Sequence, residues 1–342
     1  MTPQKENEVR KAAVELLGPS VLKNLSTIDC LFVFKSFVKI WLAIVLLIVT
    51  SIGIYSISRS LIFFLAPIFS ILIASRFHAL SVQVHEGSHN LLHANKKIND
   101  LITNFLAGYW ILYDVELYRS THFPHHRYLN TVNDPEGYYY QIQNLSKRDL
   151  LVLFLKDLSM YTAFERIFLA IRNNDKQDNR IRSRDKLKSS LMLQSFFKMA
   201  CLVLIAFLFS LTFSFPDSLY FFFILWIYPL FAIFPTLVRI RGTAEHWHSS
   251  VSNSEGIFVT TTRPFSKIEN LFIGSQMEYH VEHHLFPNVP YKGQRELHKI
   301  LYNGRFYSTL NEELLSSSYL QTWIKIFKYS SKGAIYVDST HP

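Results

Sequence analysis

The sequence has very little cysteine: its 342 residues include two, Cys30 and Cys201, and Cys201 lies inside an apolar run. This scarcity excludes a disulfide framework and a cysteine-based metal site. Repeats at solenoid spacing and linkers rich in Gly, Ser or Pro are also missing from the sequence. We therefore expect a single domain over residues 1–342, in which any metal must depend on histidine.

Residues 1–18 lack the short basic start and the apolar core of a secretory signal, and they carry both charge signs. We expect a cytosolic lead-in there. The net charge of +9 does not indicate a nucleic-acid partner, because Lys and Arg concentrate in residues 1–39 and 147–188, beside apolar runs. With 49% hydrophobic and 15% aromatic residues, the composition predicts an integral membrane protein.

Four apolar runs approach the length of about 20 residues that crosses a bilayer. They form two closely spaced pairs, at about residues 40–58, 61–75, 199–215 and 219–238. The connectors hold almost no positive charge, whereas eleven Lys and Arg lie between Lys147 and Lys188. We expect two transmembrane hairpins in a multi-pass, all-α protein. Both termini and a helical cap, made by residues 76–190 and 239–342, should be cytosolic.

Prolines and two weaker apolar stretches refine this prediction. Pro67, Pro229 and Pro235 should kink the second and fourth spans. Residues 101–113 are too few to cross a bilayer, and residues 150–171 include four charged side chains. Both stretches are predicted to be helices lying at the membrane interface.

Histidine carries the strongest chemical signal. Eight of the fourteen histidines fall into three motifs, HEGSH, HFPHH and HVEHH, which we call boxes one, two and three. Their histidines are His85 and His89 in box one, His122, His125 and His126 in box two, and His280, His283 and His284 in box three. Helical spacings of three and four residues bring such imidazoles together on one face.

The boxes are expected on helices outside the bilayer. A helix from Leu61 to about Asn90 would be roughly 45 Å long and would carry box one beyond the membrane. Box two should begin a helix, with Pro124 in its first turn and Ser120 or Thr121 as its cap. Pro287 should end the helix of box three.

Imidazole suits iron, copper, nickel and zinc, so the ligand type leaves the metal open. Ligand number is more informative, because a structural zinc site needs four ligands and a hydrolytic one needs three and a water. Eight or nine histidines suit two metal ions instead. With a lipid substrate and a site outside the spans, an oxygen-activating di-iron centre accounts best for the pattern.

HEGSH, HFPHH and HVEHHLFP, with two hairpins between them, resemble the membrane fatty acid desaturase family over roughly residues 40–300. The resemblance implies that the eight box histidines bind two irons, with His246 of the sequence AEH as a further ligand. It also implies that dioxygen is used to remove hydrogen from an unactivated methylene, giving an alkene, or to insert oxygen, giving an alcohol.

Residues near the boxes receive weaker predictions. Ligating imidazoles usually donate their second N–H to a carboxylate, so the supporting candidates are Glu86, Asp134, Glu245 and Glu282. His78, His298 and His341 are interpreted as ordinary polar residues and His248 as pointing away, while His93 is a geometrically possible ligand. Arg239 and Arg241 are interpreted as interfacial anchors.

Four other functions compete with acyl desaturation. Carotenoid ketolases and hydroxylases resemble the chain in the same boxes, including the Asp134-Pro135-Glu136 that follows box two, and other lipid hydroxylases share the chemistry. A membrane zinc hydrolase would need fewer histidines. A metal transporter should carry ionisable residues inside its spans, which these spans almost lack.

The expected partners are a lipid or acyl substrate and a separate electron donor, such as ferredoxin or a cytochrome with its reductase. A His-Pro-Gly-Gly haem motif does not occur in the sequence, so we expect no fused cytochrome. The basic residues 173–188 are interpreted as a solvated cytosolic face, with docking of an acidic electron donor as the alternative. The sequence does not distinguish a bacterial inner membrane from the endoplasmic reticulum.

Overall fold

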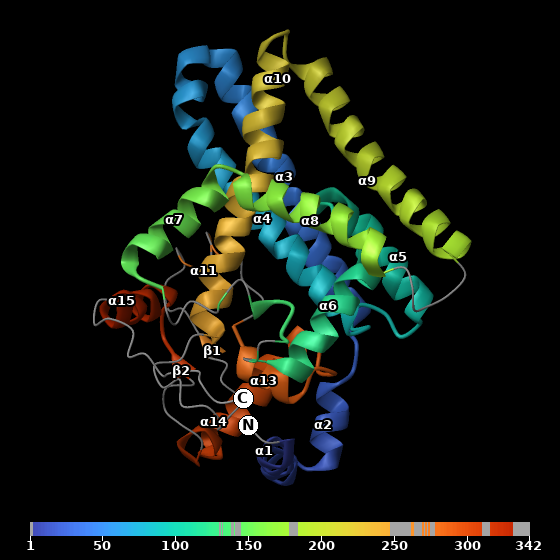
Figure 1. The fold of residues 1–342 in the computed structure, drawn as a ribbon, viewed down its shortest axis with the longest axis vertical. Helices are drawn as coiled ribbons and strands as arrows, with labels where there is room; N and C mark the ends of the chain where they lie inside the picture. Colours follow the sequence, from blue (N-terminus) through green and yellow to red (C-terminus); the bar gives the residue numbers. More distant parts are fainter. Residues whose placement is uncertain are drawn as a thin grey trace.

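The computed structural model describes residues 3–129, 131, 133–137, 140, 145–177, 184–246, 261, 262, 269, 271, 273, 278–309 and 315–330. Helices dominate this part of the chain (Figure 1). The α-helices of the described residues are α1 (Pro3–Leu17), α2 (Pro19–Leu25), α3 (Cys30–Ile57), α4 (Arg59–Ser88), α5 (Lys96–Leu106), α6 (Val115–Tyr128), α7 (Lys147–Leu158), α8 (Tyr161–Gln177), α9 (Arg184–Thr212), α10 (Asp217–Phe222), α11 (Phe234–His246), α13 (His280–Leu285), α14 (Tyr291–Asn303) and α15 (Tyr319–Ser330).

Short elements complete the fold. Two 3-10 helices, η1 (Gly108–Ile111) and η5 (Phe306–Thr309), and two π-helical turns, η3 (Phe223–Ile227) and η4 (Pro229–Ile233), lie between the longer helices. Strands β1 (Thr261–Thr262) and β2 (Leu315–Ser316) pair in parallel, with Thr261 opposite Leu315 and Thr262 opposite Ser316.

Within the described residues, four helical segments are long and apolar enough to cross a membrane: Cys30–Ile57, Arg59–Ser88, Met192–Thr212 and Asp217–His246. Each overlaps one of the four predicted apolar runs and is longer, because helix formation does not stop where the apolar composition ends; the third, however, ends at Thr212, before the predicted residue 215. The second and fourth segments continue into the cap and bring His85 and His246 there (Figure 1).

The two hairpins are joined to each other at their short connectors. Ser58 ends α3 and caps α4, where its hydroxyl accepts a bond from the Leu61 N–H. Asp217, at the start of α10, accepts a 2.6 Å bond from the Tyr55 hydroxyl and a 2.5 Å bond from Arg59. Residues from both hairpins therefore share one polar cluster at the end of the bundle away from the boxes.

The fourth membrane-spanning segment, Asp217–His246, contains π-helical turns next to its prolines. Pro229 has no N–H and disturbs the preceding helical turn, and η3 and η4 lie directly before and after Tyr228. The Thr236 hydroxyl donates 2.8 Å to the Ala232 carbonyl, which supports the backbone close to Pro235. By contrast, α4 continues through Pro67 as one helix.

The predicted interface helix over residues 150–171 is two helices, α7 and α8, because the chain turns at Ser159 and at Met160, whose φ is 64°. In Figure 1 both lie across the direction of the spans. They expose apolar side chains, including Leu151, Leu155 and Phe168, as expected for helices that face lipid.

Arg239 is not an interfacial anchor, and that interpretation was wrong. Its guanidinium binds the Asp157 carboxylate of α7 through Nε at 2.5 Å and Nη2 at 3.1 Å, and both side chains are at most 5% exposed. Arg241 is also mostly enclosed, with Nη1 3.3 Å from His78 Nε2 of α4. These arginines fix α7 and α4 against α11.

The cap below the spans has its own apolar core. Ala13 and Leu17 of α1 pack with Phe286 and with Leu297 and Leu301 of α14. The amphipathic N-terminal lead-in is therefore helical and covers the helix that follows box three.

Replacing Asp157 with Ala should lower the free energy of unfolding by about 3–5 kcal/mol, because Arg239 would keep a buried charge without its carboxylate partner. Thermal unfolding in detergent micelles checks this. The control Lys156→Ala removes an exposed charge from the same helix and should change stability little. Equal melting temperatures for Asp157→Ala and wild type would contradict the structural role of the pair.

Candidate metal centre

Box one lies where α4 ends. His85 is in the last turn and His89 is the C-cap residue. Gly87, between them, faces α5: a Cβ there would lie 2.0 Å from the Thr103 hydroxyl oxygen. Glycine is therefore required at the middle of box one to bring α4 against α5.

Box two lies in the second half of α6. This helix begins earlier than predicted, at Val115, with the Asp114 carboxylate accepting bonds from the N–H groups of Glu116 and Leu117. Ser120 and Thr121 are inside the helix, and Pro124 is in its interior. The predicted cap was wrong because the stronger capping carboxylate lies one and a half turns upstream.

Box three forms the short helix α13, which ends at Leu285, before Pro287 as predicted. His280, His283 and Val281 are buried. The helix is too short to be stable by itself, so its packing on α14 and α1 must hold it in place.

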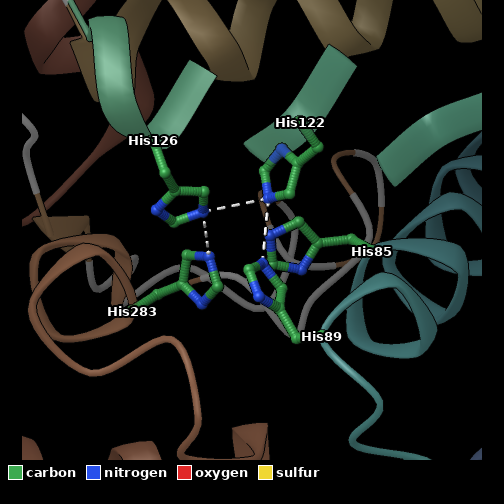
Figure 2. Close-up of side chains that lie close together, drawn as sticks. All are labelled: His85, His89, His122, His126 and His283. Atoms are coloured by element: carbon green, nitrogen blue, oxygen red, sulfur yellow. Dashed lines mark hydrogen bonds between the residues drawn. The ribbon is translucent and has the colours of Figure 1, made fainter. Parts of the chain in front are cut away.

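Five histidines from the three boxes form one group: His85, His89, His122, His126 and His283. Figure 2 shows their rings pointing toward one another from α4, α6 and α13. The Nε2 atoms of His89 and His126 each lie 3.0 Å from Nε2 of His122, and Nε2 of His283 lies 3.1 Å from that of His126. Each residue offers one nitrogen within 4.8 Å of all the others.

A second group of three consists of His125, His246 and His284, again with ligand atoms within 4.8 Å of one another. His280 lies beside it, with Nε2 2.9 Å from Nε2 of His246. The ring centroids of His126 and His284 are 4.4 Å apart, so the two groups are neighbours. All nine histidines predicted as ligands are thus brought together in the cap.

The spacing of these nitrogens fits metal coordination. A metal–nitrogen bond of roughly 2.1 Å puts ligands at right angles about 3.0 Å apart. Several nitrogens in the groups are buried without a hydrogen-bond partner among the described residues, including both in His85, Nδ1 of His246 and Nε2 of His284. Buried nitrogens are rarely left unbonded, so bound cations would satisfy atoms that the chain itself does not.

Burial keeps most of these imidazoles neutral. It lowers the pKa of His89 to about 4, and it lowers the pKa of His126 and of His283 well below the ordinary value. His125 differs: burial, the largest single effect, lowers its pKa, but the hydrogen bond to Asp134 and the charges of Glu136 and Asp134 together outweigh burial and raise the pKa. Neutral imidazole is the form that binds a metal, so the first group is ready for ligation near pH 7.

Two carboxylates after box two support its histidines. Nδ1 of His125 bonds Asp134 at 2.9 Å, and Nδ1 of His122 bonds Glu136 Oε1 at 3.1 Å. These bonds leave Nε2 of each ring for a metal. Tyr140 also donates its hydroxyl to Asp134, and its ring stacks on His246 at a centroid distance of 4.5 Å. Asp134 was predicted, whereas Glu136 was quoted in its motif without a role and Tyr140 was missed.

The other predicted supports differ from one another. Glu86 Oε1 is 3.7 Å from Nδ1 of His85, and Glu245 Oε2 is 3.7 Å from Nδ1 of His280. Glu282 instead bonds His298 and the Tyr307 hydroxyl. It therefore supports the docking of α13 on α14, and His298 is a buried structural residue.

The remaining histidines do not join either group among the described residues. His78 is buried beside Arg241. His93 accepts a 2.9 Å bond from the backbone N–H of Asn95. His248 and His341 lie outside the described residues.

Arg119, which the sequence reasoning did not identify, connects boxes one and two. From α6, three residues before His122, it donates 2.8 Å bonds to the carbonyls of Ser88 and Gly87 at the end of α4. Nη1 binds one oxygen of Asp100 at 2.9 Å, and Nη2, which also bonds the Gly87 carbonyl, binds the other. Burial alone would raise the pKa of Asp100, but bonds from Arg119, Lys96 and Asn99 lower it to about 2. The last carbonyl groups of α4 are thus bound by a charged side chain of α6, the helix that carries box two.

Comparison with known proteins gives two findings. The family model described as fatty acid desaturase matches residues 58–309, which contain all three boxes and His246. The dihydrorhizobitoxine desaturase of Bradyrhizobium elkanii is 24% identical over 237 residues, an alignment that covers 66% of this chain and 65% of that protein. The chain therefore spans just under two-thirds of this relative's length.

Substituting Arg119 with Lys should weaken metal retention by the five-histidine group and lower stability by about 2–4 kcal/mol. A lysine cannot reproduce the planar fork, and hydrogen bonds to charged groups contribute roughly 1.5–3 kcal/mol each. Metal content per chain and thermal unfolding measure the two effects. Arg127→Lys, an exposed change on the same helix, is the control; if both variants behave alike, the connection has no special role.

Changing Asp134 to Asn should reduce metal affinity about 10- to 100-fold, because His125 would lose the carboxylate that fixes its tautomer and orientation. Competition against a chelator measures the affinity. Glu116→Gln removes an exposed carboxylate from α6 and should leave affinity unchanged. Unaltered affinity in Asp134→Asn would show that the contact does not support a ligand.

Proposed function

This chain belongs to the fatty acid desaturase family, and from that premise we propose that it is a membrane-bound, dioxygen-dependent di-iron enzyme that introduces a carbon–carbon double bond into a fatty acyl chain. Family membership and four apolar helices support an integral membrane oxidoreductase of the desaturase type.

The observation that carries the proposal is the pair of adjacent histidine groups. Nitrogens from α4, α6, α11 and α13 meet in two places, with five histidines in one and three in the other. A single zinc ion needs at most four protein ligands, so this arrangement supports two metal ions. Bound iron would activate dioxygen. Imidazole ligands suit iron, and here carboxylates hydrogen-bond to the imidazoles.

The chain's own residues have three roles in this proposal. The box histidines and His246 would hold the ions through nitrogens that are now close together and mostly buried. Asp134 and Glu136 would fix which nitrogen of His125 and His122 faces the metal. The surrounding apolar packing would exclude water, which protects a reactive site from side reactions.

A lipid substrate fits the position of the centre. His85 and His246 lie on continuations of two membrane-spanning helices, so an acyl chain in the bilayer would approach the histidines along these helices. The exposed apolar side chains of α7 and α8 support a cap that would lie against the membrane surface. Electrons would come from a separate ferredoxin or cytochrome, and the positive charge of residues 147–188 favours a cytosolic cap and cytosolic termini.

The test is to express the wild-type chain and His283→Ala in a host that supplies iron, a reductase and candidate lipids, and to compare lipid extracts by untargeted mass spectrometry. We expect a loss of two hydrogens from an acyl chain with wild type and its absence with the variant. His93→Gln, which alters a histidine outside both groups that contacts the backbone of Asn95, serves as a folding control.

Other outcomes decide between related functions. A gain of oxygen would reassign the protein as a hydroxylase or ketolase of the same superfamily. If the purified protein holds one or two zinc ions, and the lipid extracts show hydrolysis and no oxidised product, the protein is a membrane hydrolase.

A further inference from the structure

The C-terminal helix α15 reaches the candidate metal centre from outside the segment that matches the family. That match ends at residue 309, whereas α15 spans Tyr319–Ser330. Tyr319 is 5% exposed, and it packs with Ala244 of α11 in a small apolar core. Its hydroxyl donates a 3.0 Å bond to Glu245 Oε1.

Glu245 stands between α15 and box three. While Tyr319 binds Oε1, the other oxygen, Oε2, lies 3.1 Å from Arg241 Nε and 3.7 Å from His280 Nδ1. The carboxylate is fully enclosed. Contacts with protein side chains therefore set the orientation of the Glu245 carboxylate, and the Tyr319 hydroxyl is the contact that comes from α15.

The orientation of Glu245 matters because His280 has two nitrogens with different surroundings. Nε2 is 2.9 Å from Nε2 of His246, whereas Nδ1 is buried without a hydrogen-bond partner among the described residues. A small shift would let Glu245 accept the Nδ1–H, and this would direct the lone pair of Nε2 toward the three-histidine group.

The position of α15 is itself well defined. Trp323 donates its indole N–H to the Ile240 carbonyl of α11 at 3.0 Å. Glu269 accepts a 2.6 Å bond from the Ser318 hydroxyl and a 3.3 Å bond from the Tyr319 N–H at the start of the helix. These contacts fix α15 on α11 and so hold the Tyr319 hydroxyl next to Glu245.

We propose that Tyr319 is a positioning residue that acts through Glu245 to make His280 the fourth ligand of the metal ion held by His125, His246 and His284. This inference rests on the proposed di-iron function, and it adds a contribution from a part of the chain beyond the family segment. It predicts that the two metal ions respond differently to a change in α15.

The experiment uses the full-length protein in nanodiscs, loaded with 57Fe(II) without oxygen. Mössbauer spectra distinguish the two iron environments, and release to a chelator gives a rate for each ion. The variants are Tyr319→Phe, which removes one hydroxyl, and Trp323→Phe, which weakens α15 docking without altering Glu245. Glu245→Gln and the double variant Tyr319→Phe/Glu245→Gln complete a double-mutant cycle.

We expect two iron ions per chain in wild type, and in Tyr319→Phe a roughly 10-fold or greater increase in the release rate of one ion, in line with other supporting residues. The second ion should match wild type, and Trp323→Phe, which keeps the Tyr319 hydroxyl, should raise the release rate less than Tyr319→Phe does. The double variant should lose no more than Glu245→Gln alone, because Tyr319 acts through that carboxylate.

Several results would overturn the inference. Wild-type release rates in Tyr319→Phe would show that the hydroxyl does not position a ligand. Equal loss of both ions, or the same loss in Trp323→Phe, would show a general effect of α15 docking. A wild-type protein that retains no iron would instead overturn the proposed function, which separates the two failures.

Discussion

The fold depends on bringing many imidazole nitrogens into one small buried volume. Each nitrogen there gives up hydration, and Nε2 atoms 3.0–3.1 Å apart cannot all satisfy one another, since a neutral imidazole has only one N–H to donate. Such an arrangement costs free energy unless the surrounding structure holds it in place and cations complete it. The spans, the cap helices and the buried charged residues hold the two histidine groups in this arrangement.

That support comes from residues far apart in the sequence. Arg119 binds the carbonyls of Gly87 and Ser88 at the end of α4 and so relates box one to box two. Asp134 and Glu136 fix the rings of box two from the chain just after it. Box three is a helix of six residues, and it depends on Glu282, His298 and Tyr307 to dock against α14.

The membrane-spanning helices determine how far the candidate metal centre lies from the apolar bundle. Because α4 and the fourth segment continue without interruption from apolar to polar sequence, His85 and His246 are carried by elements anchored in the bilayer. The buried Arg239–Asp157 pair ties α7 to the same helix, so the exposed apolar side chains of α7 are fixed relative to the histidines. Under the proposed function, this connection would hold the metal centre at a fixed distance from the membrane surface that supplies the lipid.

The sequence by itself determined the composition of the site and the class of fold. Apolar runs of nearly bilayer length predict spans because the hydrocarbon thickness leaves few alternatives, and eight histidines at helical spacing predict shared metal ligation because the periodicity places them on common faces. What the sequence could not give is which distant residues meet. The upstream cap Asp114 competed with Ser120 and Thr121, and Arg239 found a buried partner in Asp157 instead of lipid headgroups. The roles of Arg119, Tyr140 and Tyr319 likewise rest on contacts across long sequence separations. Local patterns carry no information on such contacts, because only the packing of helices in three dimensions decides which buried polar groups lie within hydrogen-bond distance.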